Sequence, residues 1–281
     1  MELLPILYRT IVQNALLEDL GRAGDLTTDS IVPRDSMARG KVLARSAGCI
    51  AGLGVAEESF RALGRPLTWK PCVGDGDVVS AGALLASIEG PARVLLTGER
   101  TALNFLGQLS GIATETRAIV SRLKGHKARV VCTRKTSPGL RILEKYAVRA
   151  GGGSNHRFGL DDAVLIKDNH LVVAGSIPEA VRRVRERMGH MIKIELEVDS
   201  WSQLEEALQQ PIDAVLLDNM SPDEVTQAVD LIAGRLLVEV SGGITPDRAV
   251  EYAKAGVDLI SIGWLTHSAP ALDVSLDVEL A

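Results

Sequence analysis

The second half of the chain alternates short apolar runs with longer segments in which apolar residues recur at helical spacing. The runs are rich in β-branched residues and end in glycine or a polar residue, as strands do; they are residues 129–135, 163–169, 192–198, 214–219, 236–243 and 259–264. The intervening segments begin with Ser or Thr, and most have an early Pro, which is typical of helix N-termini. This alternation predicts a parallel α/β barrel or a doubly wound sheet.

The ends of the runs favour the barrel. Nearly every run carries polar residues at its carboxyl end, and the carboxyl-terminal face of a barrel is where active sites are built. In the run 192–198, Lys193, Glu195 and Glu197 alternate with apolar residues. If the apolar residues face the surrounding helices, the charged ones face the interior, where they need ion-pair partners or a ligand.

The first third of the chain has another pattern and predicts a separate domain. Helical segments are combined there with short strands at Gly-Asp turns, and a long amphipathic helix over 97–124 leads into the second half. The end of the chain alternates polar and apolar positions, as an added strand would. We expect an N-terminal domain of residues 1–110, to which the tail 269–281 returns, and a barrel domain of residues 111–268.

Composition narrows the class of protein. Aromatic residues make up only 3% of the chain, so the core must be aliphatic, and the formal net charge is -5. An acidic chain without interleaved basic and aromatic residues is a poor candidate for a nucleic-acid partner. No apolar run approaches the roughly 18–20 residues of a transmembrane helix. The N-terminus lacks a basic leader and a cleavage site, so we expect a cytoplasmic protein without a membrane partner.

Positive charge is nevertheless concentrated in one window. From Lys127 to Lys167 the sequence has nine Lys and Arg against three Asp and Glu, and the window includes the glycine run of GGGSNHR, residues 151–157. Arg134, Lys135, Arg157 and Lys167 suit an anion with several carboxylates or phosphates, since Arg grips such groups bidentately and Lys acts as a point charge. Cys49, Cys72 and Cys132 have neither disulfide nor zinc spacing.

Acidic residues and glycine turns follow on the later runs. Glu197 and Asp218 could be ligands of Mg²⁺, which takes one or two carboxylates together with substrate phosphates. Alternatively, Glu195 or Glu197 pairs internally with Lys193 or with a cation at the carboxyl ends of the strands. The turns at Ser241-Gly242-Gly243 and at Ile262-Gly263 could hold a phosphate on backbone amides.

Three functions remain open from the residues alone. One is group transfer on a Mg²⁺-bound polyphosphate. Another is carbon–carbon chemistry through a Schiff base on Lys167, as in a class I aldolase. The third is a non-catalytic regulator that binds an anion.

Long motifs resemble one family over essentially the whole chain. They are EDLGRAGDLTTDSIVP, ERTALNFLGQLSGIAT, TRKTSPGLRILEKYAVRAGGGSNHRFGL, VLIKDNH, LLDN and EVSGGI, and they look like those of quinolinate phosphoribosyltransferase. The resemblance implies an N-terminal α/β sandwich domain and an open, roughly seven-stranded α/β barrel, whose remaining strand we place near 147–151. It also implies a homodimer or larger assembly, and a reaction of quinolinate with phosphoribosyl pyrophosphate and Mg²⁺ that yields nicotinate mononucleotide, pyrophosphate and carbon dioxide.

The resemblance also implies roles for matching positions. The quinolinate carboxylates would be bound by Arg134, Arg157, His156 and Lys135, beside Thr133, and by Arg100 of a second subunit. Lys167 would lie between the two substrates, and Glu197 and Asp218 would hold the ribose hydroxyls and Mg²⁺. The phosphate would lie in the turns Ser241-Gly242-Gly243 and Ile262-Gly263-Trp264, where Trp264 is larger than expected. The catalytic residues would be Lys135, Lys167, Glu197 and Asp218.

Two related families are the nearest rivals. The paralogue associated with molybdate-transport operons lacks the ERTALN and KDNH segments. Nicotinate phosphoribosyltransferase would need fewer cations for its acceptor, which has one carboxylate.

Overall fold

The six apolar runs of the second half, together with one further short strand, form a seven-stranded parallel sheet in the computed structural model, which describes residues 3–281. The chain falls into two units. The unit with this sheet comprises Ala118–Lys135 and Gly153–Trp264; the other comprises the chain up to Arg117, Thr136–Gly152 and Leu265–Ala281. The expected domain limits at 110/111 and 268/269 stay a prediction.

The parallel sheet is an open barrel, as the resemblance implied. Its strands follow the order β7-β6-β12-β11-β10-β9-β8, so β7 and β8 are its edges. The strands are β6 Arg129–Cys132, β7 Ser154–Asn155, β8 Val164–Ile166, β9 Ile194–Val198, β10 Ala214–Asp218, β11 Leu237–Ser241 and β12 Leu259–Ser261. All neighbouring strands are parallel.

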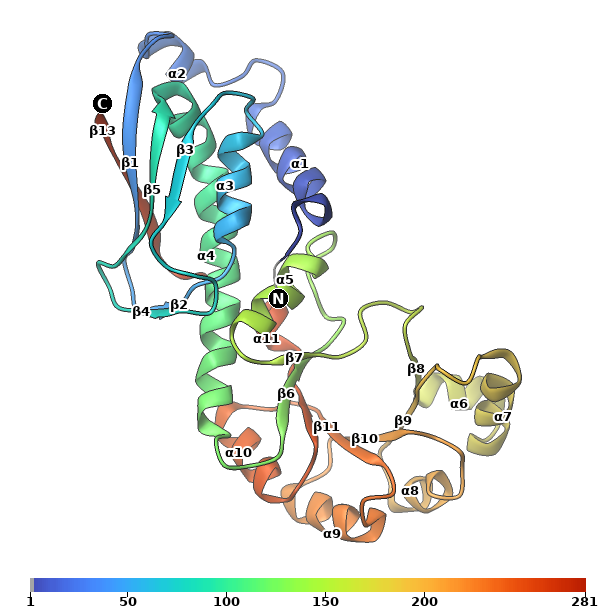
Figure 1. Cartoon of the computed structure of the whole chain (residues 1–281). Helices are drawn as coiled ribbons and strands as arrows, with labels where there is room; N and C mark the ends of the chain where they lie inside the picture. The colour runs from blue at the N-terminus through green and yellow to red at the C-terminus, as the bar shows by residue number, and fades with distance from the viewer. Residues whose placement is uncertain (1–2) are drawn as a thin grey trace. The chain divides into compact units, whose positions relative to one another are not determined.

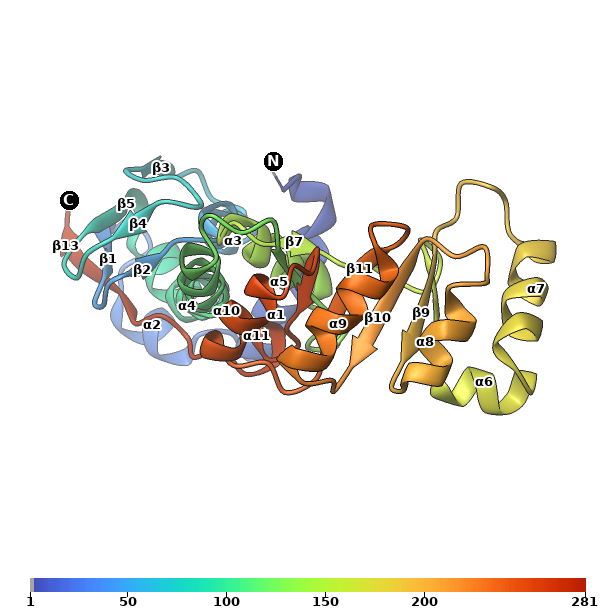
Figure 2. The ribbon, with the colours of Figure 1, turned by 90° about the horizontal axis from the view of Figure 1, so that it is seen from below.

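Helices follow the strands of this sheet one after another (Figure 2). They are α6 Asp168–Ala174, α7 Ile177–Arg187, α8 Trp201–Ala207, α9 Pro222–Ile232 and α10 Pro246–Lys254. The expected N-caps are confirmed where Ser176, Ser221 and Thr245 accept a hydrogen bond from the backbone N–H three residues on. Ser200 precedes α8 without such a bond. The early prolines cost no hydrogen bond, because the first helical N–H has no partner within the helix.

The strand expected near 147–151 is not formed. These residues end helix α5 Arg141–Ala150 in the other unit. Leu143, Ala147 and Val148 are buried at the spacing of one helix face, and this helical period decides the structure of the segment. The seventh strand is β7, which follows the glycine run. A Cβ on Gly151 would lie 2.5 Å from the carbonyl oxygen of Ala113, so only glycine fits where the chain leaves α5.

The other unit is built on a four-stranded antiparallel sheet in the order β13-β1-β5-β3. Its strands are β1 Met37–Ala44, β3 Thr68–Pro71, β5 Leu84–Pro91 and β13 Val274–Leu280, and β2 Gly48–Cys49 pairs separately with β4 Val78–Val79. Its helical segments are η1 Pro5–Leu7, α1 Arg9–Leu20, α2 Leu26–Ile31, α3 Leu53–Arg61, α5 and most of α4 Ala92–Arg122; α11 Trp264–His267 begins at its border.

The core of this unit lies between the sheet and its helices. Figure 1 shows α3 and the first part of α4 beside the sheet. Val42 and Ile88 from the sheet, Phe60 from α3, and Leu95 and Leu106 from α4 belong to one buried cluster. No helix of residues 3–281 is long and apolar enough to cross a membrane.

Candidate active site

A pocket of about 440 Å³ lies at the carboxyl ends of the parallel strands. All its lining residues belong to the unit that contains this sheet. They are Thr133, Arg134, Lys135, His156, Arg157, Leu165, Lys167, Glu197, Leu216, Asp218, Glu239, Ser241 and Ser261. The cations and the acids that the sequence singled out are therefore brought together in one place.

Strand register explains why these side chains share the pocket. Leu216 of β10 pairs with Glu197 of β9 and with Glu239 of β11, and Asp218 pairs with Ser241. Residues level with one another in parallel strands point to the same face of the sheet, and alternate residues along a strand point to opposite faces. The alternation noted in the sequence thus places Glu197 and Asp218 on the interior face, whereas Lys193 is exposed and its Nζ lies 2.6 Å from Asp213 Oδ1.

Arg157 and Arg134 form the cationic part of the pocket. The Arg157 guanidinium donates a hydrogen bond from Nη1 to the carbonyl oxygen of Ala163 at 3.2 Å. Burial lowers the pKa of Arg157, and the positive charge of Arg134 lowers it further. Two guanidinium groups that repel each other in a partly buried pocket are stabilised by an anion that neutralises both.

Lys167 lies next to the acids, directly after β8, which pairs with β9. Its ammonium group forms an ion pair with the Glu197 carboxylate, and its backbone N–H donates to Nδ1 of His170 at 2.8 Å. His170 therefore caps the N-terminus of α6. A lysine ion-paired with a carboxylate is a poor amine nucleophile, because a Schiff base requires the neutral amine. The ion pair disfavours the aldolase-like alternative.

The glycine turn after β11 is shaped by its neighbour on β10. Asn219 has φ 57° and donates from Nδ2 to Asp218 Oδ2 at 2.7 Å. Gly242 has φ 104°, and a Cβ there would lie 2.1 Å from Asn219 Oδ1. Glycine is required at this position both for the backbone conformation and for the space.

The carboxylates of Glu197 and Asp218 fit the expected Mg²⁺. Both line the same pocket, and two carboxylates with room for phosphate oxygens are a typical donor set for this ion. Their assignment as metal ligands stays a prediction.

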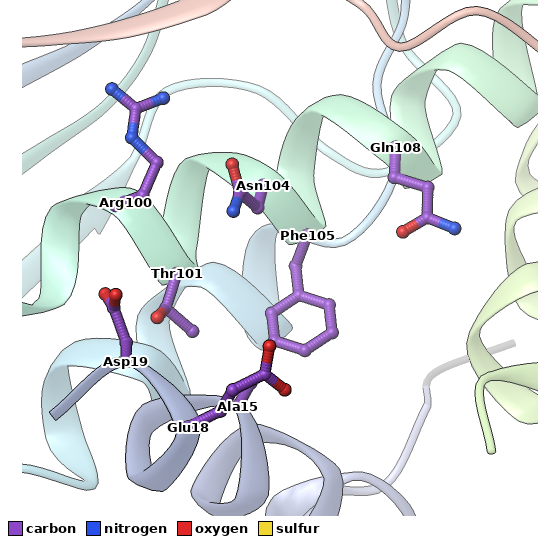
Figure 3. A pocket seen from close by; sticks show the side chains of 8 residues that line it. All are labelled: Ala15, Glu18, Asp19, Arg100, Thr101, Asn104, Phe105 and Gln108. Atoms are coloured by element: carbon purple, nitrogen blue, oxygen red, sulfur yellow. The ribbon is translucent and has the colours of Figure 1, made fainter. Parts of the chain in front are cut away.

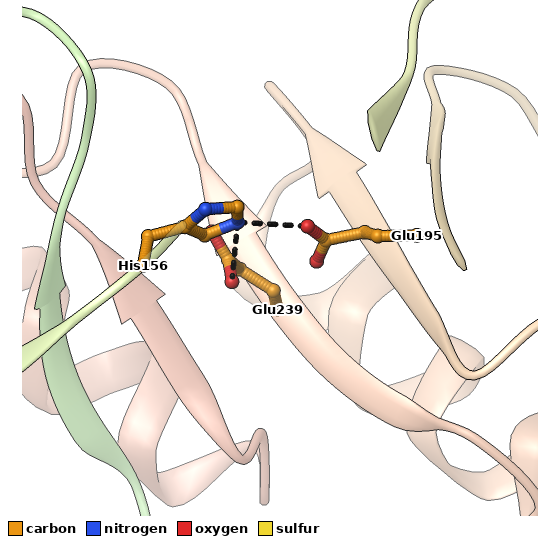
Figure 4. A group of neighbouring side chains, drawn as sticks. All are labelled: His156, Glu195 and Glu239. Carbon is orange, nitrogen blue, oxygen red and sulfur yellow. Dashed lines mark hydrogen bonds and ion pairs between the residues drawn. The ribbon is translucent and has the colours of Figure 1, made fainter. Parts of the chain in front are cut away.

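A second pair of acids, Glu195 and Glu239, lies beside His156 (Figure 4). Nε2 of His156 lies 2.8 Å from Glu195 Oε2 and 3.6 Å from Glu239 Oε2. Burial, together with the negative charge of Glu195, raises the pKa of Glu239 to about 8. Neither carboxylate oxygen of Glu239 has a hydrogen-bond partner within residues 3–281.

Arg100 lies in the other unit, on α4. It lines a separate hollow of about 250 Å³ together with Glu18, Asp19, Asn104 and Gln108. Figure 3 shows Arg100 and Asn104 projecting from α4, while Glu18 and Asp19 come from α1. The donation of Arg100 to the site of a second subunit stays a prediction.

The remaining predicted phosphate ligands lie near the pocket in sequence but are not among its lining residues; they are Gly242, Gly243, Ile262, Gly263 and Trp264. Ile262 is buried and its N–H donates to the carbonyl oxygen of Val131 at 2.9 Å. Trp264 donates from Nε1 to the carbonyl oxygen of Ile244 at 2.9 Å. The indole thus ties the start of α11 to the turn after β11, and its role toward phosphate stays a prediction.

Four lining residues were not predicted from the sequence, namely Leu165, Leu216, Glu239 and Ser261. The sequence does contain a signal for Glu239. It stands between two apolar residues, Val238 and Val240, in a buried strand, and Glu195 has the same kind of position in β9. A charge on the interior face of an otherwise apolar strand indicates a partner or a ligand. The two leucines carry no such signal.

Comparison with known proteins agrees with this geometry. A family model described as quinolinate phosphoribosyl transferase, C-terminal domain, matches residues 112–277, and the N-terminal domain model of the same family matches residues 25–110. The chain belongs to the quinolinate phosphoribosyltransferase family. A Bacillus subtilis protein named "Probable nicotinate-nucleotide pyrophosphorylase [carboxylating]" is 44% identical over 97% of this chain and 94% of its own length.

Other members of the family support the match. A Nicotiana tabacum protein named "Quinolinate phosphoribosyltransferase [decarboxylating] 1b" is 37% identical over 96% of this chain and 83% of its own length. The crystal structure of NadC from Streptococcus pyogenes has 40% sequence identity and a TM-score of 0.96, and the match covers 100% of this chain and 99% of that one. The family's two-domain fold is therefore the fold of this chain.

Proposed function

We propose that the chain transfers the phosphoribosyl group of phosphoribosyl pyrophosphate to quinolinate, with loss of carbon dioxide, and so forms nicotinate mononucleotide for NAD biosynthesis. The observation that carries the proposal is the pocket in which Arg134, Arg157 and Lys135 lie with Lys167, Glu197 and Asp218 in a member of this family. The enzyme is a pentosyltransferase that acts on small molecules.

The acceptor is bound by the cations. Quinolinate has two adjacent carboxylates, and Arg134 and Arg157 offer planar forks that match them. Burial and the charge of Arg134 both lower the pKa of Arg157, and a dianion between the two guanidinium groups offsets this cost of holding both charged. Lys135, which lines the same pocket, adds a third positive charge.

The chemistry needs alignment more than a strong base. The ring nitrogen of quinolinate attacks the ribose carbon that bears the pyrophosphate, the nitrogen–carbon bond forms and the carbon–oxygen bond to pyrophosphate breaks. Holding the two reactants in line supplies much of the rate, and Lys167, ion-paired with Glu197, places a cation near the departing diphosphate. The ribosylated ring is then a cation. As carbon dioxide leaves, the ring accepts the electron pair of the bond between the ring carbon and the carboxylate carbon, and a proton then binds to that ring carbon.

Mg²⁺ is proposed as the cofactor, held by Glu197 and Asp218. When bound, the ion neutralises the diphosphate and makes it a better leaving group. Support comes from the donor set, because both carboxylates line the pocket.

The proposal extends to the assembly and the location. Arg100 lies on α4 outside the cationic pocket, and we infer that it completes the quinolinate site of a second subunit in a homodimer or larger assembly. Cys49, Cys72 and Cys132 form no disulfide among the described residues, which suits the reducing cytoplasm.

One incubation tests the reaction. Purified protein with phosphoribosyl pyrophosphate and Mg²⁺ is divided between quinolinate and nicotinate, and products are followed by mass and by carbon dioxide release. We expect nicotinate mononucleotide and carbon dioxide from quinolinate only. Product from nicotinate only would assign the protein to the non-decarboxylating transferases. If neither acceptor reacts, the proposal is wrong, and borohydride trapping on Lys167 tests the aldolase-like alternative.

A further inference from the structure

The His156 ring is fixed at both of its nitrogens. The backbone N–H of Arg157 donates to Nδ1 at 2.7 Å. A backbone amide can only donate, so Nδ1 carries no proton and the hydrogen of the neutral ring is on Nε2. That hydrogen points to Glu195, whose Oε2 lies 2.8 Å from Nε2. The ring therefore links a buried carboxylate on β9 to the backbone at Arg157.

Two carboxylates lie around the same nitrogen. The Glu239 side chain is 1% exposed and the Glu195 side chain 11%, and they come from β11 and β9, on either side of β10. Figure 4 shows both carboxylates directed at Nε2. Buried carboxylates at this density are retained only where they hold a proton or a cation.

The distances favour a proton over a metal ion. The three side chains offer ligand atoms that lie within 4.8 Å of one another. With metal bonds of about 2.0–2.1 Å, tetrahedral ligand atoms lie about 3.3 Å apart. The 2.8 Å between Nε2 and Glu195 is shorter than that and is a normal hydrogen-bond length. The burial that raises the Glu239 pKa also favours its protonated form at neutral pH.

We propose that Glu195 and Glu239 are positioning residues of the acceptor site that together clamp the His156 ring: Glu195 holds the ring by the hydrogen bond at Nε2, and Glu239, 3.6 Å from the same nitrogen, confines it from the other side. The ring in turn fixes the backbone from which the Arg157 guanidinium reaches the dicarboxylate. Neither glutamate needs to touch substrate for this role. If the clamp is lost, His156 can rotate about its side-chain bonds, the Arg157 amide loses its acceptor, and the guanidinium is no longer held for a bidentate contact. Small displacements of this kind are costly, because two parallel hydrogen bonds need one geometry.

The consequence is selective for one substrate. Arg157 serves the acceptor, whereas Glu197 and Asp218 on β9 and β10 serve the phosphoribosyl donor. Loosening the clamp should therefore weaken the binding of quinolinate and leave the binding of phosphoribosyl pyrophosphate unchanged. The inference rests on the proposed function, since it assumes that quinolinate is the acceptor.

Isosteric and apolar variants of both glutamates test the clamp. Glu195→Gln and Glu239→Gln keep the shape, and Glu195→Leu and Glu239→Leu remove every polar atom. Glu186→Gln, at an exposed glutamate of α7 that is ion-paired with Arg182, is the matched control. Calorimetry gives the Kd of each substrate, steady-state kinetics give KM and kcat, and thermal unfolding shows that each variant is folded.

We expect the Leu variants to raise the quinolinate Kd by about tenfold or more, the range for loss of one partner of a buried polar network. Glu195→Gln should raise it by about fivefold, because it exchanges a charge-assisted hydrogen bond for a neutral one. Glu239→Gln should have a smaller effect than Glu195→Gln, because an amide resembles a protonated carboxyl group. KM for quinolinate should rise while kcat at saturation changes by less than about twofold, and donor binding should match that of Glu186→Gln.

Three results would overturn the inference. One is quinolinate binding within twofold of wild type in both Gln variants. Another is an equal loss of affinity for both substrates, which indicates collapse of the pocket. The third is a stoichiometric divalent metal that copurifies with wild type and is lost in the variants. If wild-type protein neither binds nor converts quinolinate, the proposed function fails and the inference falls with it; if wild type does both and the variants match it, the clamp alone is wrong.

Discussion

Replacing Arg134 by Ala should impair quinolinate binding and leave donor binding intact. Arg134 lines the pocket and lies close enough to Arg157 for its charge to lower the Arg157 pKa. The change removes one of the two guanidinium groups that match the two carboxylates of the acceptor. The donor-side acid Glu197 keeps its ion pair with Lys167 when Arg134 is replaced.

The structure sets the size of the effect. Losing one partner of a buried, hydrogen-bonded charge pair costs ~2–5 kcal/mol. Arg134 is only half-buried, and its removal relieves the repulsion that acts on Arg157. Both considerations favour the lower part of the range, about 2–3 kcal/mol. The quinolinate Kd should then rise by about 30- to 150-fold.

Calorimetric titration with quinolinate measures this change, and steady-state assays at saturating phosphoribosyl pyrophosphate give the matching KM. Arg134→Lys should recover only part of the affinity, because an ammonium group lacks the planar fork. Arg183→Ala is the control, since Arg183 is an exposed residue of α7 that is paired with Glu179. A quinolinate Kd within twofold of wild type in folded Arg134→Ala protein would refute the assignment of Arg134 to the acceptor.

Three further predictions concern other parts of the site. Asp218→Asn should raise the Mg²⁺ concentration that gives half-maximal rate, and full activity at limiting Mg²⁺ would count against the metal role. Gly242→Ala should lower the free energy of unfolding by about 1–3 kcal/mol in denaturant titrations, because its Cβ would meet Asn219 Oδ1 and φ is 104°; unchanged stability would show that the turn relaxes. The Glu239 pKa rises from 4.5 to about 8 on folding, so between these pH values the folded chain binds more protons and loses stability as pH rises. Glu239→Gln should flatten that decline, and an identical pH profile would contradict it.

The barrel could be predicted from the sequence because its strands and helices carry independent signals. β9 alternates charged and apolar residues, and α7, α9 and α10 begin with a capping Ser or Thr followed by Pro. Each signal is local, and each agrees with the same alternation of strand and helix. Agreement of local signals with one global fold is what makes such a prediction reliable.

The segment around α5 shows where local signals fail. The composition of the four residues Ala147–Ala150 does not distinguish a strand from the last turn of a helix. The decision comes from Leu143, which is buried on the same helix face, and from Gly151, where any side chain would collide with Ala113. Both facts depend on packing that a short window does not contain.

The candidate site likewise contains residues that local signals predict and residues that they do not. Lys167, Glu197 and Asp218 could be predicted to lie together because the carboxyl ends of parallel strands share one edge of the sheet. Glu239 was missed because it stands inside its strand rather than at the end. Arg100 was assigned through the resemblance alone, and its place on α4 of the other unit could not follow from strand ends.

The order of the strands separates the charges of the pocket, and this separation orients the reaction. Arg134 follows β6 and Arg157 follows β7, at one edge of the sheet, whereas Glu197 and Asp218 belong to β9 and β10, across β12 and β11. On the proposed function, the dicarboxylate binds at the first side and the diphosphate of the donor at the second, where Glu197 and Asp218 would hold Mg²⁺. Lys167, beyond β9 on β8, balances the acids there. On the same proposal, the two substrates bind in opposite halves of one pocket, with the ring nitrogen of the acceptor and the ribose carbon of the donor between them, so that the charge distribution itself aligns the reacting atoms.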